Sequence, residues 1–557
     1  MSTTYTNKQS AETSKYNVVG TRPIRHDGYD KVTGRARFGA DLVMAGQLHG
    51  RILRSPHAHA RILSIDTSKA EALEGVMAVA TAKDFPVIQD RILDFAESQS
   101  SVRMQAENLL AHDKALYQGH AIAAVAAINP HIAEEALKLI DVEFEILPSV
   151  ITADEAMKED APILHDSLTT MFKVDRFGAG DNTGVNSNIA SHVQITRGDI
   201  QQGFKEADLV IERSFTTQTV HQGYIEPFAC SAQWSTDGHL TIWCSTQAIF
   251  GIRGATSAIL NIAESDIKVI PMEIGGGFGG KLTTYLEPVA AVLARKSGHA
   301  VKMVMNRKEV FEATGPTSGS TMRCKIGADK SGQITAIELW MAYEAGAYPG
   351  SPIAGGVFTA TGPYNIENFA IDGLDVVVNK PKSQAYRAPG QPAANYAVET
   401  VLDEIAEKLG IDPLELRIKN KASDGDRAPA GVPHTSLGLD DLHQAMKDHP
   451  QYKTPLTGPN QGRGIAIGYR LNGGGSGSSA TINVTANGTI QLITGSMDIG
   501  GTRAAVSMQA AEILGISAED VTPTVVDTDS VGWTGGTGGS RIAFDTGLAA
   551  IRAAEEV

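Results

Sequence analysis

Residues 267–281, with the sequence IKVIPMEIGGGFGGK, join an apolar run to a loop rich in glycine. The run 267–274 is expected to form a strand, and a helix is predicted to begin at about Thr283. A strand, a glycine loop and a helix N-terminus together present unpaired backbone N–H groups to an anion. The stretch therefore predicts a ligand site at the junction of a strand and a helix.

Three interpretations of this loop compete. The spacing from Gly275 to Lys281 matches a phosphate-binding P-loop, but Leu282 stands where a Ser or Thr hydroxyl should hold magnesium. The same letters satisfy Gly-x-Gly-x-x-Gly, but the acidic ribose ligand expected about 20 residues later is missing, and the next predicted strand ends in Asn306. The glycines could also serve only the geometry of a tight turn.

The recurrence of such loops favours a ligand over a turn. Glycine-rich stretches return at 473–479 (GGGSGSS), at 500–502 (GGT), where a helix is predicted to open, and at 535–541 (GGTGGSR). Several loops without bulky side chains allow close backbone approach to a large, flat, phosphate-bearing cofactor. We therefore expect these distant loops to converge on one site.

The remaining elements are predicted from apolar periodicity. Expected strands are 142–147, 208–215 and 240–244, and expected helices are 131–140, 285–297, 394–408 and 502–514. At 557 residues the chain is long enough for three or four domains.

Composition shifts divide the chain as follows. A polar leader (1–15) precedes a compact α+β unit (16–150) and a connecting segment (151–188), and the remainder divides near residue 430 into 189–430 and 431–557.

Composition also excludes several classes of function. With 42% hydrophobic and 20% charged residues and no uncharged apolar run of about 18 residues, the chain reads as globular, without a membrane span. Its 48 Lys and Arg against 63 Asp and Glu give a net charge of −15, which opposes nucleic-acid binding. The polar N-terminus has no secretory signal, so cytoplasmic residence is expected.

The cysteines do not form a cluster motif. Cys230, Cys244 and Cys324 contain no Cys-x-x-Cys pair, so these residues alone cannot hold an iron–sulfur cluster or a structural zinc. They are expected to be buried free thiols.

Six segments carry a resemblance to a known family. They are 30–38 (DKVTGRARF), 54–60 (RSPHAHA), 221–227 (HQGYIEP), 245–247 (STQ), 275–281 (GGGFGGK) and 385–390 (AYRAPG). Together they resemble the xanthine dehydrogenase and aldehyde oxidase family of molybdenum hydroxylases, over essentially the whole chain. The resemblance implies an α+β molybdopterin-binding large subunit, truncated or split at its C-terminus. Its fold would be an N-terminal α/β hammerhead-like domain followed by a large mixed α/β molybdopterin-binding domain that is incomplete at its C-terminus.

The resemblance also implies site residues. The cofactor is expected to be molybdenum-molybdopterin, with the cytosine dinucleotide as one form. Its dithiolene sulfurs would hold the metal, so the protein supplies orientation rather than side-chain ligands. Phe278, Arg387 and Gly539 would lie beside the metal, and the full set of expected cofactor contacts is Gln247, Gly276, Gly277, Phe278, Gly279, Arg387, Gly500, Gly501, Thr502, Gly539, Ser540 and Arg541. The substrate pocket would include Leu282, Gly355, Ala388 and Pro389.

Departures from the family pattern restrict the substrate. Leu282 and Gly355 replace the Glu and Arg of purine-oxidising members, which disfavours a purine. Ala388 replaces the copper-binding Cys of carbon monoxide dehydrogenases, so no copper is expected. The family's Gly-Gln-Gly contact reads Gly500-Gly501-Thr502, which implies a contact through the backbone alone.

Some of these residues also have a structural interpretation. Without the family match, Arg387 could pair with a buried carboxylate. Glu226 is expected to support the structure, and His57 and His59 to pack or lie at the surface.

No catalytic residue is expected within the chain. The family's general base, a glutamate in a Gly-x-Gly-Glu segment, would lie beyond Val557, so the chain alone should be inactive. The implied reaction is hydroxylation of an N-heterocycle or an aldehyde, a small-molecule substrate, with water as the oxygen source. The implied partners are an iron–sulfur subunit, a FAD subunit and a small subunit that carries the missing molybdenum segment. The alternatives are a non-catalytic remnant that acts in assembly or binding and, third, a nicotinamide-dependent dehydrogenase.

Overall fold

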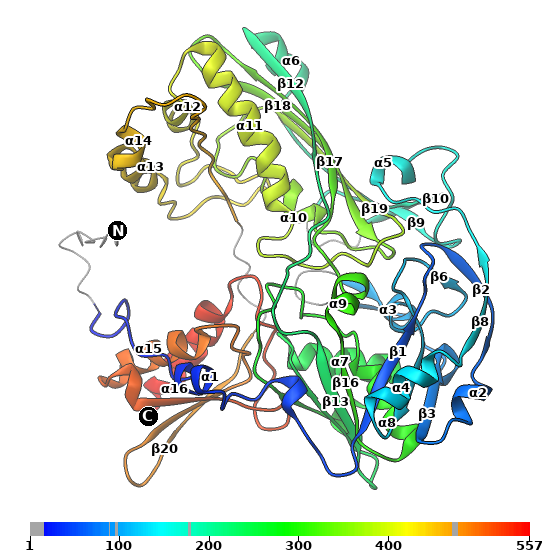
Figure 1. Cartoon of the computed structure of the whole chain (residues 1–557). Helices are drawn as coiled ribbons and strands as arrows, with labels where there is room; N and C mark the ends of the chain where they lie inside the picture. The colour runs from blue at the N-terminus through cyan, green and yellow to red at the C-terminus, as the bar shows by residue number, and fades with distance from the viewer. Residues whose placement is uncertain (1–15, 89, 95–98, 176–179, 471–476) are drawn as a thin grey trace.

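The computed structural model of the chain describes residues 16–88, 90–94, 99–175, 180–470 and 477–557. Two seven-stranded sheets form the body of the molecule, and a smaller unit that contains α15, α16 and β20 lies beside the lower sheet (Figure 1). The lower sheet has the order β15 (Ile267–Pro271), β14 (Leu240–Cys244), β13 (Ala229–Trp234), β16 (Val301–Val304), β1 (Leu48–Arg54), β7 (Ala121–Ala127) and β3 (Val76–Thr81).

The lower sheet combines distant parts of the sequence. Strand β1 runs parallel to β16, with Leu48 opposite Val301, and antiparallel to β7. Helices α7 (Ile249–Leu260) and α8 (Glu287–Ser297) pack against this sheet and against each other. The strands of residues 16–150 thus share a sheet and a core with residues 229–304.

The upper sheet is mostly antiparallel. Its order is β10 (Asp181–Asn186), β9 (Thr169–Lys173), β11 (Ile189–Arg197), β19 (Phe369–Val377), β18 (Ile334–Gly346), β17 (Ser320–Ala328) and β12 (Leu209–Thr217). Helix α11 (Gln391–Leu409) packs on β12 and β17. The segment 151–188, predicted to be a connection, instead contributes β9 and β10 to one end of this sheet.

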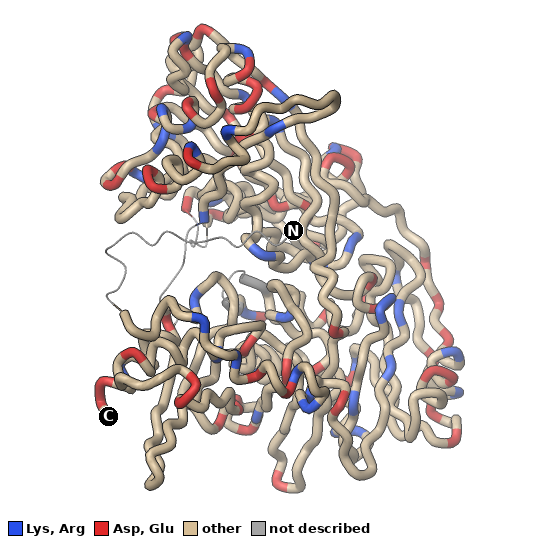
Figure 2. Tube along the Cα trace, turned by 60° about the vertical axis from the view of Figure 1, so that its left-hand side comes forward, with Lys and Arg blue, Asp and Glu red and all other residues tan. Residues whose placement is uncertain are grey.

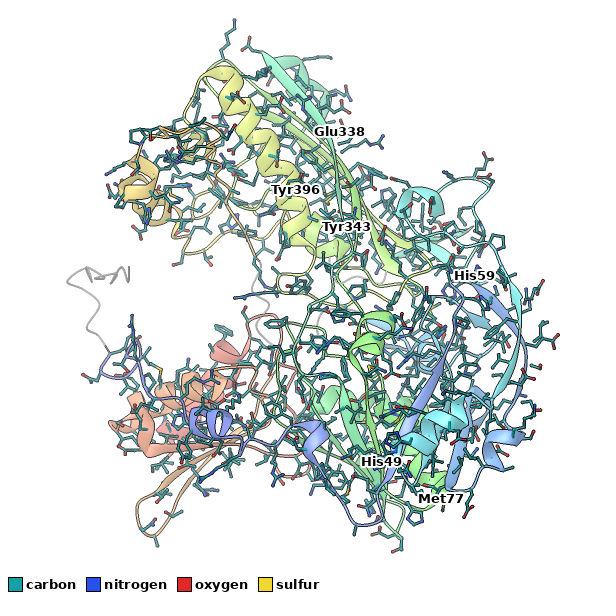
Figure 3. The ribbon with its side chains drawn as sticks, in the orientation of Figure 1. His49, His59, Met77, Glu338, Tyr343 and Tyr396 are labelled. Atoms are coloured by element: carbon teal, nitrogen blue, oxygen red, sulfur yellow. The ribbon has the colours of Figure 1, made fainter. Side chains whose placement is uncertain are left out.

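A hydrogen bond joins the upper sheet to the start of α11. Tyr343, on β18, lies near this end of the helix (Figure 3). Its hydroxyl donates to the carbonyl of Gly390, the residue that precedes α11, at 2.7 Å. The turn that carries Arg387 is thereby fixed at the lower edge of the upper sheet.

The smaller unit consists of β20 (Ala480–Val484), β21 (Ile490–Thr494) and β22 (Val521–Val525), packed with α15 (Thr502–Leu514) and α16 (Gly547–Glu555). The N-terminal segment docks onto it, because the Glu512 carboxylate accepts backbone N–H groups of residues 17–19. Helix α13 (Leu439–Asp448) stays with the upper sheet's helices, where Lys447 pairs with Glu415. Helix α13 therefore contacts the upper sheet's helices, although it follows the predicted division near residue 430.

The other elements are short. The remaining strands are β2 (Ala60–Asp66), β6 (Lys114–Ala115) and β8 (Asp141–Ile146), which form one sheet, and β4 (Ile92–Asp94) with β5 (Gln99–Ser101). The remaining α-helices are α1 (Gly28–Thr33), α2 (Ser68–Glu71), α3 (Val102–Leu109), α4 (Pro130–Leu137), α5 (Ala153–Ala156), α6 (Ile200–Glu206), α9 (Arg307–Ala313), α10 (Ile353–Val357), α12 (Pro413–Lys419) and α14 (Pro450–Lys453).

Charged residues of both signs are interspersed along the fold. Lysine and arginine lie among aspartate and glutamate over both sheets and the smaller unit (Figure 2). In the described part of the chain, no helix combines the length and the apolar character needed to cross a membrane. Cys230, Cys244 and Cys324 are buried free thiols, as predicted.

Candidate functional site

The Gln247 side chain joins two of the glycine loops. Its Oε1 accepts the N–H of Gly279 at 3.0 Å and that of Lys281 at 3.2 Å, and its Nε2 donates to the carbonyl of Thr537 at 2.7 Å. The backbone N–H of Thr537 donates in turn to the Gln247 carbonyl at 2.8 Å. Loops 275–281 and 535–541 therefore converge, as the sequence predicted, through a buried amide.

A buried ion pair supports loop 275–281 from below. Lys281 is fully buried, and its Nζ donates to Glu226 Oε2 at 2.7 Å. Burial lowers the pKa of Lys281, and the Glu226 charge opposes that shift. Glu226 Oε2 also accepts the N–H of Gly275 at 2.7 Å, so Glu226 has the supporting role that was expected.

This ion pair excludes the P-loop interpretation. A P-loop lysine must reach the phosphates of a bound nucleotide, whereas the Lys281 ammonium points into the core and is paired there. In addition, β15 ends at Pro271 and α8 begins at Glu287, not at about Thr283. The glycine loop therefore does not open the helix, as both nucleotide-binding motifs require.

Three consecutive N–H groups of the loop have no acceptor in the described part of the chain. They belong to Gly276, Gly277 and Phe278, whereas the neighbouring N–H groups of Gly275 and Gly279 are bonded. Gly277 is buried, and a buried N–H without an acceptor is rare in folded proteins. These three neighbouring donors are therefore left for an acceptor that the described residues do not supply.

The Arg387 turn lies directly against this loop. The backbone N–H of Arg387 donates to the carbonyl of Phe278 at 2.9 Å. A Cβ added to Gly279 would lie 2.6 Å from the carbonyl oxygen of Ala385, so only glycine fits there. The Arg387 side chain is exposed and has no ion-pair partner among the described residues, which overturns the interpretation that it pairs with a buried carboxylate.

Backbone strain is concentrated in these same loops. Of the six described non-glycine residues with positive φ, three are Phe278 (55°), Ala388 (62°) and Ser540 (60°). Such conformations are costly for residues with a Cβ, and they cluster at ligand-binding sites.

In loop 535–541, backbone N–H groups and the Arg541 side chain differ in their partners. In the described part of the chain, the N–H groups of Gly539 and Ser540 have no acceptor. The Arg541 guanidinium is buried and is used within the protein, where it donates to the carbonyls of Gly535 and Gly477 and pairs with Asp545. Arg541 therefore holds the loop in shape. Of loop 473–479, residues 473–476 lie outside the described residues.

The helix start at 500–502 differs from the prediction. The N–H groups of Gly500, Gly501 and Thr502 all donate to Asp498 Oδ1, at 2.7, 2.8 and 3.2 Å. These donors are thus occupied by the chain itself, and a backbone contact from them to a cofactor is not supported. The pattern Asp-x-Gly-Gly-Thr before a helix is a capping arrangement that the sequence analysis missed.

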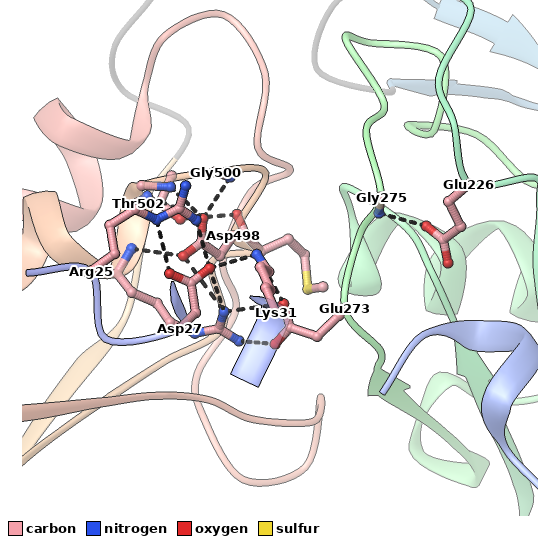
Figure 4. Close-up of polar contacts among 12 residues, drawn as sticks. Arg25, Asp27, Lys31, Glu226, Glu273, Gly275, Asp498, Gly500 and Thr502 are labelled. Carbon is pink, nitrogen blue, oxygen red and sulfur yellow. Dashed lines mark hydrogen bonds and ion pairs between the residues drawn. The ribbon is translucent and has the colours of Figure 1, made fainter. Parts of the chain in front are cut away.

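Asp498 belongs to a charged network beside the glycine loop. Arg503 lies 3.6 Å from Asp498 and pairs with Glu273 at 2.7 Å, and Lys31 bridges Glu273 and Asp27 (Figure 4). Burial raises the pKa of Asp498, but the hydrogen bond from the Gly500 N–H and the Arg503 charge lower it by more. The pKa of Asp498 therefore lies below its ordinary value. The network fixes the segment that leads into Gly275 from the side opposite Glu226.

A hollow lies beside the loop and the arginine turn. Leu282 and Pro389, two of the four residues expected at a substrate pocket, are among its lining residues. Gly355 and Ala388 are not among its lining residues. Gly355 packs against the Pro389 carbonyl, which leaves no room for a side chain.

The side chains of the site do not form a metal-ligand set. The described residues contain no group of three or more His, Cys, Asp or Glu side chains that could hold a metal ion. His57 contacts Phe144, and buried His59 bonds to the Pro148 carbonyl, so both pack as expected. A metal at this site needs ligands of its own, and the free N–H groups of the two glycine loops fit a cofactor that carries acceptor atoms.

Family comparisons match most of the chain. Residues 33–148 match the aldehyde oxidase and xanthine dehydrogenase a/b hammerhead domain, and residues 182–421 and 445–557 match molybdopterin cofactor-binding domains.

Individual relatives agree with this match. The chain is 33% identical over 428 residues to the nicotinate dehydrogenase large molybdopterin subunit of Eubacterium barkeri, covering 76% of this chain and 94% of that protein. It is 32% identical to a probable xanthine dehydrogenase subunit of Bacillus subtilis, covering 93% of this chain and 67% of the relative. The aldehyde oxidoreductase of Desulfovibrio gigas superposes with a TM-score of 0.81 at 26% identity, covering 96% of this chain and 59% of that chain.

The chain thus spans between three fifths and nearly the whole of these relatives. The mixed α/β fold with a hammerhead region ahead of a larger domain agrees with the predicted fold class. The chain belongs to the xanthine dehydrogenase and aldehyde oxidase family, as a molybdopterin-binding subunit.

Proposed function

We propose that this chain is the molybdenum-cofactor-binding subunit of a hydroxylase that oxidises an N-heterocycle or an aldehyde with water as the oxygen donor. The observation that carries the proposal is the convergence of loops 275–281 and 535–541 on Gln247, with free N–H groups on both loops. When bound, the molybdenum cofactor supplies the two-electron oxidation and the transfer of oxygen from water.

The residues of this chain hold and orient the cofactor. The N–H groups of Gly276, Gly277 and Phe278 would donate to its acceptor atoms from one side, and those of Gly539 and Ser540 from the other. Preorganised N–H donors in a fixed loop bind without a further cost of reorganisation. Arg387, whose side chain is exposed beside Phe278, would add a positive charge at the edge of the site.

An N-heterocycle is the first substrate class to test. The names of two relatives refer to nicotinate and to xanthine, which are both N-heterocycles, and a third refers to an aldehyde. Leu282 has no charge with which to bind a purine. The Pro389 carbonyl occupies the space that a side chain at Gly355 would need, so an arginine would not fit there. Both observations favour an N-heterocycle other than a purine.

The activity is proposed to need partner subunits. Iron–sulfur and FAD subunits would carry electrons away from the cofactor. We also propose the cytosine dinucleotide as one form in which the molybdopterin cofactor is bound.

Metal and pterin analysis tests the proposal. The complex purified with its co-encoded partners should contain molybdenum and pterin close to one per chain. The Gly279→Ala variant should lose at least about 90% of both, because its Cβ would strike the Ala385 carbonyl and φ is +106°. The matched control is Gly298→Ala, which also has a positive φ but no atom within 4 Å of the added Cβ, and it should keep its cofactor. Absence of molybdenum from the unmodified complex would end the enzyme proposal.

A further inference from the structure

The N-terminal segment 17–39, called the strap from here on, joins the smaller unit to the lower sheet. At its first end, the Glu512 carboxylate accepts the N–H groups of residues 17–19 at 2.6 to 2.9 Å. The Glu519 carboxylate accepts the N–H of Ile24 at 3.0 Å. Hydrogen bonds to a charged acceptor are stronger than those between neutral groups. The first half of the strap is therefore bound firmly to the smaller unit.

The other end of the strap is bound to the lower sheet. The N–H of Glu273 donates to the carbonyl of Arg37 at 2.9 Å, and the N–H of Gly39 donates to Ser245 Oγ at 3.0 Å. A Cβ added to Gly39 would lie 2.8 Å from that oxygen, so the strap approaches the sheet closely here. Glu273 stands directly before loop 275–281 in the sequence. This end of the strap is therefore attached to the segment that carries the glycine loop.

A charged network connects the two ends. Lys31, in the strap, pairs with Asp27 at 2.5 Å and with Glu273 at 3.3 Å. Arg503, on α15 of the smaller unit, pairs with the same Glu273 at 2.7 Å (Figure 4). Partly buried ion pairs such as these are screened by salt less than exposed ones. The strap, the smaller unit and the glycine-loop segment thus meet at one carboxylate.

A second hollow, open to solvent and about 420 Å³ in volume, lies between the strap, the lower sheet and the smaller unit. Most side chains that the strap contributes to its lining are charged, with Asp27, Lys31 and Arg35 among them. The smaller unit has an apolar core of its own, from which Met497 reaches the core of the lower sheet. Bodies that meet across polar groups and open space move relative to each other more readily than bodies with a large apolar interface.

The same two bodies also meet at the glycine loops. The N–H of Thr537 donates to the carbonyl of Gln247 at 2.8 Å, and the N–H of Thr528 donates to the carbonyl of Val269 at 3.2 Å. Both hydrogen bonds run from the smaller unit to the lower sheet. Because the cofactor-binding N–H groups are divided between the two bodies, the separation of the bodies decides whether these donors are placed for binding.

We propose that the strap sets the separation of loops 275–281 and 535–541, and that Glu512 and Glu519 are positioning residues for the cofactor through their hydrogen bonds to the strap. This inference rests on the proposed function and adds distant control of the same site. With both anchors in place, the smaller unit is held against the lower sheet. Without them, the smaller unit detaches transiently, and the cofactor must restore the arrangement as it binds.

Hydrogen exchange on the purified full chain without cofactor tests the proposal. In the double variant Glu512→Ala and Glu519→Ala, the N–H groups of Thr528 and Thr537 should exchange at least about 10-fold faster, because they bond across the contact. The N–H of Ile337, which bonds within the upper sheet region, should change less than about twofold. A general loss of stability would instead raise exchange at Ile337 as well.

Glu155→Ala is the matched control. The Glu155 carboxylate is also exposed and accepts the N–H groups of Ile151 and Thr152, but these bonds cap α5 within one segment. Its removal should leave exchange at Thr537 unchanged. Glu512→Gln keeps one acceptor oxygen, so it should give an exchange rate between those of the unmodified chain and Glu512→Ala.

Molybdenum retention connects the strap to the cofactor. In the complex purified with its partners, the double variant should lose molybdenum on dialysis at least about 10-fold faster than the unmodified complex, since changes of affinity appear mostly in dissociation. The proposal would be overturned by exchange at Thr537 within twofold of the unmodified chain, by an equal rise at Ile337, or by unchanged molybdenum loss despite faster exchange.

Two further outcomes are separated by design. If the double variant does not fold, as judged by its melting curve, Glu519→Ala alone decides the question by the same measurements. Absence of molybdenum from the unmodified complex would overturn the proposed function itself. That result needs no variant, so it is distinct from failure of the strap proposal, which the exchange rates of the cofactor-free chain report.

Discussion

Loop 275–281 and the helix start at 500–502 are both rich in glycine, yet their N–H groups differ in whether the described chain supplies an acceptor. At Gly276, Gly277 and Phe278 the N–H groups have no acceptor in the described part of the chain. At Gly500, Gly501 and Thr502 all three donate to the carboxylate of Asp498. A glycine-rich motif therefore does not by itself indicate a ligand site, because a side chain two residues away can satisfy its donors.

The two regions also differ in what holds them. Loop 275–281 depends on side chains from distant segments, since Glu226 and Gln247 come from before β13 and after β14. The helix start depends on its own sequence neighbour, Asp498, and on Arg503 one residue into the helix. The first region should therefore be sensitive to remote substitutions, and the second to local ones.

The largest expected effect is the loss of the buried ion pair below the glycine loop. Lys281→Met removes the cation that pairs with Glu226 and leaves the mostly buried carboxylate with hydrogen bonds from Gly275 and Ser245 alone, which should lower the free energy of unfolding by about 3 kcal/mol. Urea unfolding measures it. Lys296→Met is the control, because its pair with Asp84 is partly exposed and should be worth less than about 1 kcal/mol. Equal losses in the two variants would mean that the pair does not support the loop.

The next effect is the loss of the amide that joins the two loops. Gln247→Leu leaves the N–H groups of Gly279 and Lys281 and the Thr537 carbonyl without a partner, so we expect a loss of about 3 kcal/mol and a fall in bound molybdenum of at least about 10-fold. Gln233→Leu, on an exposed position of β13, should change stability by less than about 0.5 kcal/mol. Retention of molybdenum in Gln247→Leu would show that the loops bind independently.

Removal of the Asp498 cap should have a smaller effect on stability and should leave cofactor binding unchanged. Asp498→Ala should lower stability by about 1–2 kcal/mol, in line with other caps. Asp412→Ala is the matched control, because Asp412 caps α12 through the N–H groups of Leu414 and Glu415. Molybdenum content should be unchanged in both variants. A fall in Asp498→Ala alone would restore the helix start as a cofactor contact.

The sequence predicted elements better than their assembly. Helix α15 was predicted with its observed bounds, Thr502–Leu514, because Gly501 and Gly515 mark both ends. The pairing of β1 with β16 could not be predicted, since the paired residues Leu48 and Val301 are 253 positions apart and local periodicity carries no information on register.

The glycine-loop helix was misplaced for an identifiable reason. The Glu287 carboxylate accepts the N–H groups of Tyr285 and Leu286, and Pro288 stands in the first turn, which together begin the helix at Glu287. The proline was visible in the sequence and should have moved the predicted start.

The convergence of the glycine loops was predicted from the sequence, whereas the side chains that hold these loops in place were not. The recurrence of glycine loops predicted convergence, and the structure brings Phe278 and Arg387 into direct contact. The Lys281–Glu226 pair joins residues 55 positions apart, so it could not be predicted from local spacing.

The smallest expected effect is a pH dependence at the helix start. The folded pKa of Asp498 lies below its ordinary value of 3.8, because the Gly500 N–H and the Arg503 charge outweigh the effect of burial. Its stabilising contribution is therefore fully present above about pH 4 to 5 and is lost as pH falls through 3.8 toward the folded pKa. Urea unfolding of the unmodified chain and of Asp498→Asn should differ by a constant amount from pH 7 to pH 5, and the difference should shrink below pH 4. A constant difference down to pH 3 would show that Asp498 stabilises the helix start through hydrogen bonding alone, without its charge.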